Sequence, residues 1–102
     1  MSYISDVADQ IRQEVPPDTL PEDDIDELFL IYAVLALTVG EGVQPRHVHD
    51  AWSAWMTGHD PAHNSIRPFE ELDAHTKMED QRFVEAIRKV ASRRSYRVRH
   101  ND

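Results

Sequence analysis

The chain has 102 residues, no cysteine and a formal net charge of −8. This length fits one domain with a modest core, and the absence of thiols excludes disulfides, thiolate zinc sites and cysteine nucleophiles. The first residues lack the basic and apolar regions of a signal peptide. The longest apolar run, residues 28–39, is too short to cross a bilayer. We therefore expect a cytoplasmic protein in a reducing compartment, without membrane association.

Acidic and basic residues gather at opposite ends of the sequence. Residues 1–30 hold nine acids against Arg12 alone, and residues 88–102 hold six Lys or Arg against Asp102. Three interpretations stay open: charges that complement helix macrodipoles, contact between the two ends within or between chains, and nucleic-acid binding by the tail. The overall negative charge argues against nucleic acid, because an acidic protein repels phosphate.

Apolar residues at helical spacing predict a first helix that is capped by Ser2 or Ser5 and runs to about Glu14. Pro16 and Pro17 end it, because proline disfavours helix before itself and donates no hydrogen bond.

The second helix is the clearest prediction. Asp18 or Thr19 caps it and Pro21 lies in its first turn. Residues 25–39 are apolar on nearly all sides, which is typical of a central helix. It is expected to stop near Gly40.

A third helix is predicted from Pro45 to Gly58, followed by a loop rich in turn formers. Its inner face carries Val48, Ala51, Trp52, Trp55 and Met56. Residues 66–72 fit either an extended stretch or a single helical turn begun by Pro68.

The last helix is capped by Asp73 or Thr76 and carries an apolar stripe that includes Phe83 and Ile87. The tail after it either frays or adds a short strand. The predicted fold class is therefore all-α. A compact bundle of about four helices forms one domain over residues 1–92, with a loop between the third and fourth helices. A short basic tail follows over residues 93–102.

Catalytic and metal-binding patterns find little support. His59 and His63 have the i, i+4 spacing of helical zinc ligands, but Pro61 lies between them. Ser53 and Ser65 have no nucleophile elbow, and the three glycines form no phosphate-binding loop. We expect no enzyme, no metal site and no cofactor.

Aromatic and histidine side chains cluster around the third helix. Trp52 and Trp55 are three residues apart, His49 lies one turn before Trp52, and His63 and Phe69 follow in the loop and turn. These residues form either a plain core or the wall of a groove. A groove is compatible with tryptophan, because its indole N–H needs a partner and favours the edge of a core.

Three segments resemble the ryanodine-receptor repeat (RyR) domain: HDAW at 49–52, HNSIRPFEEL at 63–72 and KMED at 77–80. That family carries His-x-x-Trp, then His-Pro-x-Leu-Val-Pro-Tyr-Asp-x-Leu, then Lys-x-x-Asp. The similarity covers residues 48–90 and lacks the family's Gly-Trp-x-Tyr-Gly segment between the first two motifs. The whole chain is also similar to small uncharacterised proteins of actinobacteria and their phages. The resemblance implies a non-enzymatic interaction module, found in bacteria in contexts that suggest nucleotide-derived signals.

The leading interpretation is a binding module that recognises a small anionic ligand, including nucleotide-derived ones, or a protein partner. Its predicted site residues are His49, Trp52, Trp55, His63 and Phe69.

Two alternatives remain open. A phage-type accessory protein would bind a host protein through an acidic N-terminal face that includes Asp23, Asp24 and Asp26. A homodimer would dock the basic tail of one chain on the acidic helix of the other.

Lys77 and Asp80 are three residues apart on one face of the last helix, a spacing that allows them to pair with each other.

Overall fold

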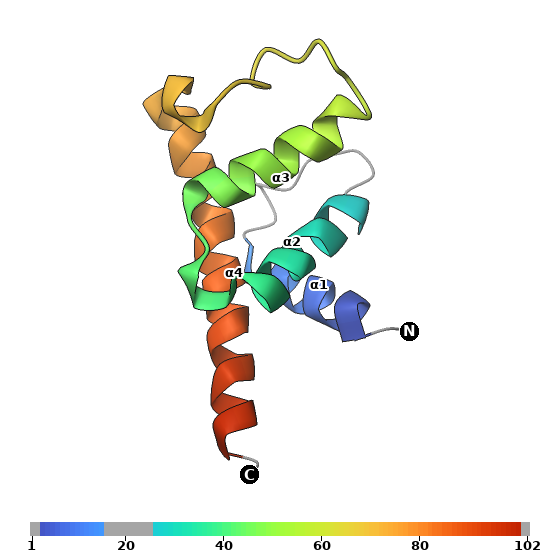
Figure 1. Ribbon diagram of the computed structural model, residues 1–102, viewed down its shortest axis with the longest axis vertical. Helices are drawn as coiled ribbons and strands as arrows, with labels where there is room; N and C mark the ends of the chain where they lie inside the picture. Colours follow the sequence, from blue (N-terminus) through green and yellow to red (C-terminus); the bar gives the residue numbers. More distant parts are fainter. Residues whose placement is uncertain (1–2, 16–25, 101–102) are drawn as a thin grey trace.

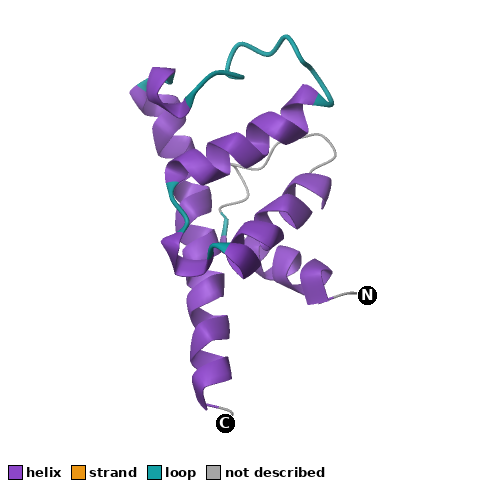
Figure 2. Ribbon diagram, viewed as in Figure 1, coloured by secondary structure: helices purple, strands orange, loops and turns teal. Residues whose placement is uncertain are grey.

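The computed structural model describes residues 3–15 and 26–100, with side chains described up to Arg94 in the last helix. The described residues form four α-helices joined by loops, without a strand (Figures 1 and 2). The helices are α1 (Tyr3–Glu14), α2 (Asp26–Thr38), α3 (Pro45–Thr57) and α4 (Ala74–His100), with short 3-10 turns η2 (Gly40–Gly42) and η3 (Phe69–Glu71). The prediction of an all-α bundle of about four helices is confirmed.

The helix ends follow the turn chemistry of the sequence. Gly40 has a φ of 69°, a left-handed conformation that ends the α2 region at low steric cost. Pro45 is the first residue of α3, where Gln44 and His47 form a reciprocal capping box. Oδ1 of Asp73 accepts a 2.8 Å hydrogen bond from the backbone N–H of Thr76, so Asp73 caps α4 as predicted.

Helix α2 lies at the centre of the bundle, in contact with α1, α3 and α4. One face is buried: Leu28, Phe29, Tyr32, Ala33 and Ala36. The ring of Tyr32 lies 5.6 Å from that of Phe29 and 5.3 Å from that of Phe83 on α4. This aromatic cluster joins α2 to α4, so the nearly uniform apolar character of α2 has the structural role predicted from sequence.

The acidic start and the basic end of the chain meet in the structure. Glu14, the last residue of α1, lies 3.1 Å from both Lys89 and Arg93 on α4. These two cations lower the pKa of the Glu14 carboxyl, chiefly through the hydrogen bond with Lys89. Of the interpretations offered by the charge pattern, contact between the two ends within one chain is therefore present.

A second link fastens the α2–α3 connection to α4. Nε of Arg88 donates a 2.8 Å hydrogen bond to the carbonyl oxygen of Val43, which is fully buried between η2 and α3. Helix α4 has 27 residues and is about 40 Å long. Its C-terminal half continues away from α3 and the loop above it (Figure 1).

The structure decides two alternatives that the sequence leaves open. Residues 66–72 contain a single helical turn that begins after Pro68, not an extended stretch throughout. The strand considered for the tail is wrong, because α4 continues as helix to His100. The predicted caps Asp18 and Thr19 of the second helix lie outside the described residues.

Candidate functional site

A cavity of about 250 Å³ lies between α2, α3, α4 and the loop after α3. Five rings wall it: Tyr32 from α2, His49 and Trp52 from α3, His63 from the loop and Phe83 from α4. The remaining lining side chains are Leu28, Ser65, Thr76, Glu79 and Asp80. The cavity is thus an aromatic chamber with a carboxylate edge supplied by α4.

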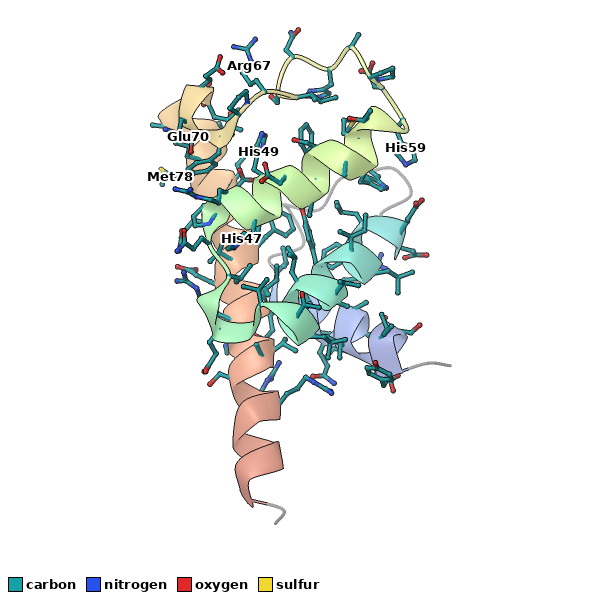
Figure 3. The ribbon with its side chains drawn as sticks, in the orientation of Figure 1. His47, His49, His59, Arg67, Glu70 and Met78 are labelled. Atoms are coloured by element: carbon teal, nitrogen blue, oxygen red, sulfur yellow. The ribbon has the colours of Figure 1, made fainter. Side chains whose placement is uncertain are left out.

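His49 is a buried residue in the wall of this chamber. Its side chain is 2 % exposed, and it projects from α3 towards the loop that carries Arg67 (Figure 3). Nε2 lies 2.6 Å from the carbonyl oxygen of Arg67. A carbonyl only accepts, so Nε2 carries a proton and donates it to Arg67. The other ring nitrogen, Nδ1, faces α4.

Asp80 lies opposite that nitrogen. Its Oδ2 is 3.7 Å from Nδ1 of His49 and has no hydrogen-bond partner among the described residues. Burial raises the pKa of the Asp80 carboxyl to about 6, with Glu79 adding to the rise and His49 opposing it. Burial, and secondarily the charge of Asp80, also raises the pKa of the Tyr32 phenol, which therefore stays neutral.

Trp52 forms the exposed side of the aromatic wall. Its half-buried indole stacks against His49, with ring centres 5.8 Å apart and an interplanar angle of 22°. It meets His63 edge to face at 5.1 Å. Nδ1 of His63 accepts a hydrogen bond from the backbone N–H of Ser65, which orients the ring within the loop. Three predicted site residues, His49, Trp52 and His63, therefore come together at the cavity.

The other two predicted site residues do not line the cavity. Trp55 is 5 % exposed and belongs to the core, with its ring 4.5 Å from that of His59. Phe69 lies at the side of His49, 6.3 Å away, and Nζ of Lys77 sits 5.3 Å above its ring. The Lys77–Asp80 pair that helical spacing allows is not formed: Lys77 approaches Phe69, while Asp80 turns inward to His49.

Most of the α4 residues that line the cavity were not predicted as site residues from the sequence. Thr76, Asp80 and Phe83 are spaced by four and three residues, so they lie on one helix face. This face continues into the buried stripe of Ile87 and Val90. A carboxylate on the apolar face of a helix is the signal that could have identified Asp80 as a site residue.

The residues around His49 do not assemble a metal centre. Among the described residues, no three His, Asp or Glu side chains converge with metal-ligand geometry. Oγ of Ser53 lies 3.4 Å from Nε2 of His49, a long contact to a nitrogen that already donates to Arg67.

Within the part of the chain that the structure describes, none of the helices has the length and apolar character needed to span a membrane.

A family model described as a domain of unknown function, DUF7701, matches residues 2–92. The chain belongs to the DUF7701 family. The matched range of the DUF7701 domain includes every residue that lines the cavity. No curated protein and no solved structure matches the chain. Neither the RyR resemblance nor a link to actinobacteria or phages is shown by these comparisons.

The acidic face considered as an alternative site is described only in part. Asp23 and Asp24 lie outside the described residues. Asp26 is exposed, and its Oδ1 forms a 2.8 Å ion pair with Arg12 of α1. Asp26 therefore links α1 to α2 through an exposed ion pair.

Proposed function

We propose that the DUF7701 domain is a non-enzymatic binding module whose cavity receives one small flat group. The observation that carries the proposal is the chamber of five rings between α2, α3 and α4. Flat ligands stack favourably on aromatic side chains, and a few polar atoms at one edge set their orientation. The hollow between Glu14, Arg82 and Lys89 has no aromatic wall.

The size of the cavity limits what can enter. Its volume of about 250 Å³ is slightly below the range of about 300–1,000 Å³ that is usual for sites of drug-sized molecules. A single heterocycle, the base of a nucleotide with its sugar outside, or one side chain of a protein partner would fit. The RyR resemblance favours the same region, because its histidine and tryptophan positions correspond to His49, Trp52 and His63.

Binding is favoured over catalysis by the state of His49. A histidine acting as a base towards a serine needs a free ring nitrogen next to the hydroxyl. Nε2 of His49 instead donates to the Arg67 carbonyl at 2.6 Å, and Ser53 is 3.4 Å away. The imidazole is therefore positioned as a fixed wall of the chamber.

Native mass spectrometry of gently purified protein tests the proposal. We expect an additional mass of a few hundred daltons on the wild-type chain. This mass should be lost in Trp52→Ala and retained in Trp52→Phe, because phenylalanine keeps a flat stacking surface. Met78→Ala is a matched control, since Met78 is 68 % exposed on α4 and does not line the cavity.

Two results would contradict the proposal. One is a retained ligand that is unaffected by Trp52→Ala in a folded protein, which would place the ligand elsewhere. The other is a wild-type chain that neither retains a ligand nor binds any flat probe. The folded state of each variant is checked by circular dichroism.

A further inference from the structure

We infer that the group received by the cavity is a flat nitrogen cation, of the amidinium or protonated-heterocycle class, that binds the carboxylate of Asp80. This inference rests on the proposed function, because it specifies the ligand class of the same cavity. It is opposite in charge to the anionic ligand expected from sequence. The reasons are the charge of the lining, the unpaired oxygen of Asp80 and the aromatic walls.

The ionisable groups that face Asp80 leave the cavity without a fixed positive charge. Helix α2 contributes the neutral phenol of Tyr32, α3 contributes His49, and the loop contributes His63. On α4 itself Glu79 adds a second carboxylate, which is 58 % exposed and 3.2 Å from His75. No lysine or arginine lines the cavity in the described residues. An anion entering here would meet two carboxylates without a permanent counter-charge.

Two basic side chains next to cavity residues in the sequence or the fold make contacts of their own. Nε of Arg67 donates a hydrogen bond to the backbone oxygen of Asn64, and Nζ of Lys77 lies over the outer ring Phe69. Oδ2 of Asp80 is buried and lacks a hydrogen-bond donor among the described residues. A buried carboxylate oxygen without a donor is costly, and an N–H cation supplies the missing bond in its strongest, charge-assisted form.

The protonation state of Asp80 decides how a cation is accommodated. Burial raises the pKa of the Asp80 carboxyl to about 6, so at about pH 8 the group is ionised, and its Oδ2 lacks a hydrogen-bond donor among the described residues. A cation then binds this carboxylate through charge-assisted hydrogen bonds, and no covalent bond is made or broken. Trp52 and Phe83 also line the cavity, and aromatic rings attract cations that lie over their faces.

Three probes of one shape test this inference: benzamidine, which is a cation, neutral benzamide and anionic benzoate. Binding is followed by the indole N–H signals of the protein in proton–nitrogen NMR. Trp52 lines the cavity and reports on it, while Trp55 lies outside and is an internal reference. At about pH 8, we expect benzamidine to bind at least about tenfold more tightly than benzamide, and benzoate more weakly than either.

Asp80→Asn is the decisive variant. It should weaken benzamidine at least about tenfold and leave benzamide nearly unchanged. The asparagine amide can donate to Nδ1 of His49, so the fold is expected to persist. Glu85→Gln is the matched control, because it removes an exposed charge from the same helix away from the cavity. In the wild type, benzamidine should also bind more tightly at about pH 8 than at about pH 5, because Asp80 is protonated at the lower pH.

The outcomes separate the two proposals. Equal or tighter binding of benzamide or benzoate, or an Asp80→Asn variant that binds benzamidine like the wild type, overturns the cation inference and leaves the cavity as a site. If none of the three rings shifts the Trp52 signal at millimolar concentrations, the proposed function fails as well. Should Asp80→Asn not fold, the order of the three probes on the wild type still decides the inference.

Discussion

Nδ1 of His49 lies 3.7 Å from Oδ2 of Asp80, and the two side chains are only 2 % and 13 % exposed. The opposite ring nitrogen of His49 donates to Arg67. Removing ionised groups from water is costly, and mutual attraction compensates fully only when the geometry is good. At 3.7 Å the contact is longer than a strong hydrogen bond, so the pair costs stability when Asp80 is ionised.

We predict that Asp80 makes the protein less stable as the pH rises. Its folded pKa of about 6 lies above the unfolded value of about 3.9, so the folded state binds more protons in between. The contribution of Asp80 to the free energy of unfolding should therefore fall from about pH 4 to about pH 7. The loss is about 1–2 kcal/mol, because access of water from the cavity reduces the full effect of a shift of two pKa units.

Urea denaturation of wild type and Asp80→Asn across this pH range measures the effect. The variant should be more stable than the wild type at about pH 8, and the two should converge at about pH 4. Comparing the two proteins cancels the titration of the other carboxylates. A variant that is less stable than the wild type at about pH 8 would mean that the ionised pair stabilises the fold.

The helices were predictable from sequence because their signals are local. Residues 25–39 are apolar on nearly all sides, and Gly40, Pro45 and Asp73 mark helix ends by their own backbone or side-chain chemistry. The C-terminal extension of α4 was not predicted, since alternating Tyr96 and Val98 suggest a strand. A helix already formed through Ala91 continues at low cost, which outweighs that weak pattern.

The candidate site was only half predictable, because its other half depends on tertiary packing. Trp52 and Trp55 point only about 60° apart around α3, so periodicity assigns both to one face. Packing against α2 and α4 then buries Trp55 and leaves Trp52 at the cavity. Helical spacing allows Asp80 to pair with Lys77, whereas its neighbour in the structure, His49, lies 31 positions earlier in the sequence. No local pattern records such a contact.

Trp55 is predicted to lower the stability of the core through its unsatisfied indole N–H. Its Nε1 is buried and has no hydrogen-bond partner among the described residues. Trp55→Phe removes this unsatisfied donor together with part of the ring, so its two effects oppose each other and the net change should stay within about 1 kcal/mol. Trp55→Ala leaves a large cavity and should cost about 3–5 kcal/mol. Chemical denaturation measures both values.

The comparison of the two Trp55 variants has a clear contrary result. If Trp55→Phe is as destabilising as Trp55→Ala, the indole N–H has a partner that stabilises it. In proton–nitrogen NMR, both variants should shift the Trp52 indole N–H signal only slightly, because Trp55 does not line the cavity.

Arg88 is predicted to stabilise the fold through its contact with Val43. Its Nε donates to a buried carbonyl, and Arg88→Ala leaves that oxygen without this donor. We expect a loss of about 1–2 kcal/mol in urea denaturation. Arg82→Ala is the matched control, because Arg82 is exposed on the same helix, and it should change stability by less than about 0.5 kcal/mol. Equal effects of the two substitutions would show that charge, rather than the hydrogen bond, is responsible.

Gly40 is predicted to be required for its backbone conformation alone. Its φ of 69° is unfavourable for residues with a side chain, yet a Cβ at this position would meet no atom within 4 Å. Gly40→Ala should therefore cost about 1 kcal/mol through strain, and Gly40→Asn should cost less, because asparagine tolerates the left-handed region.

Gly42→Ala is the control in the same turn: its Cβ would make an ordinary 3.9 Å contact with Val39, and its φ lies outside the left-handed region. Thermal unfolding of the three variants should rank Gly40→Ala as the least stable. A Gly42→Ala variant that is equally destabilised would show that the whole η2 turn, and not the left-handed residue, limits substitution.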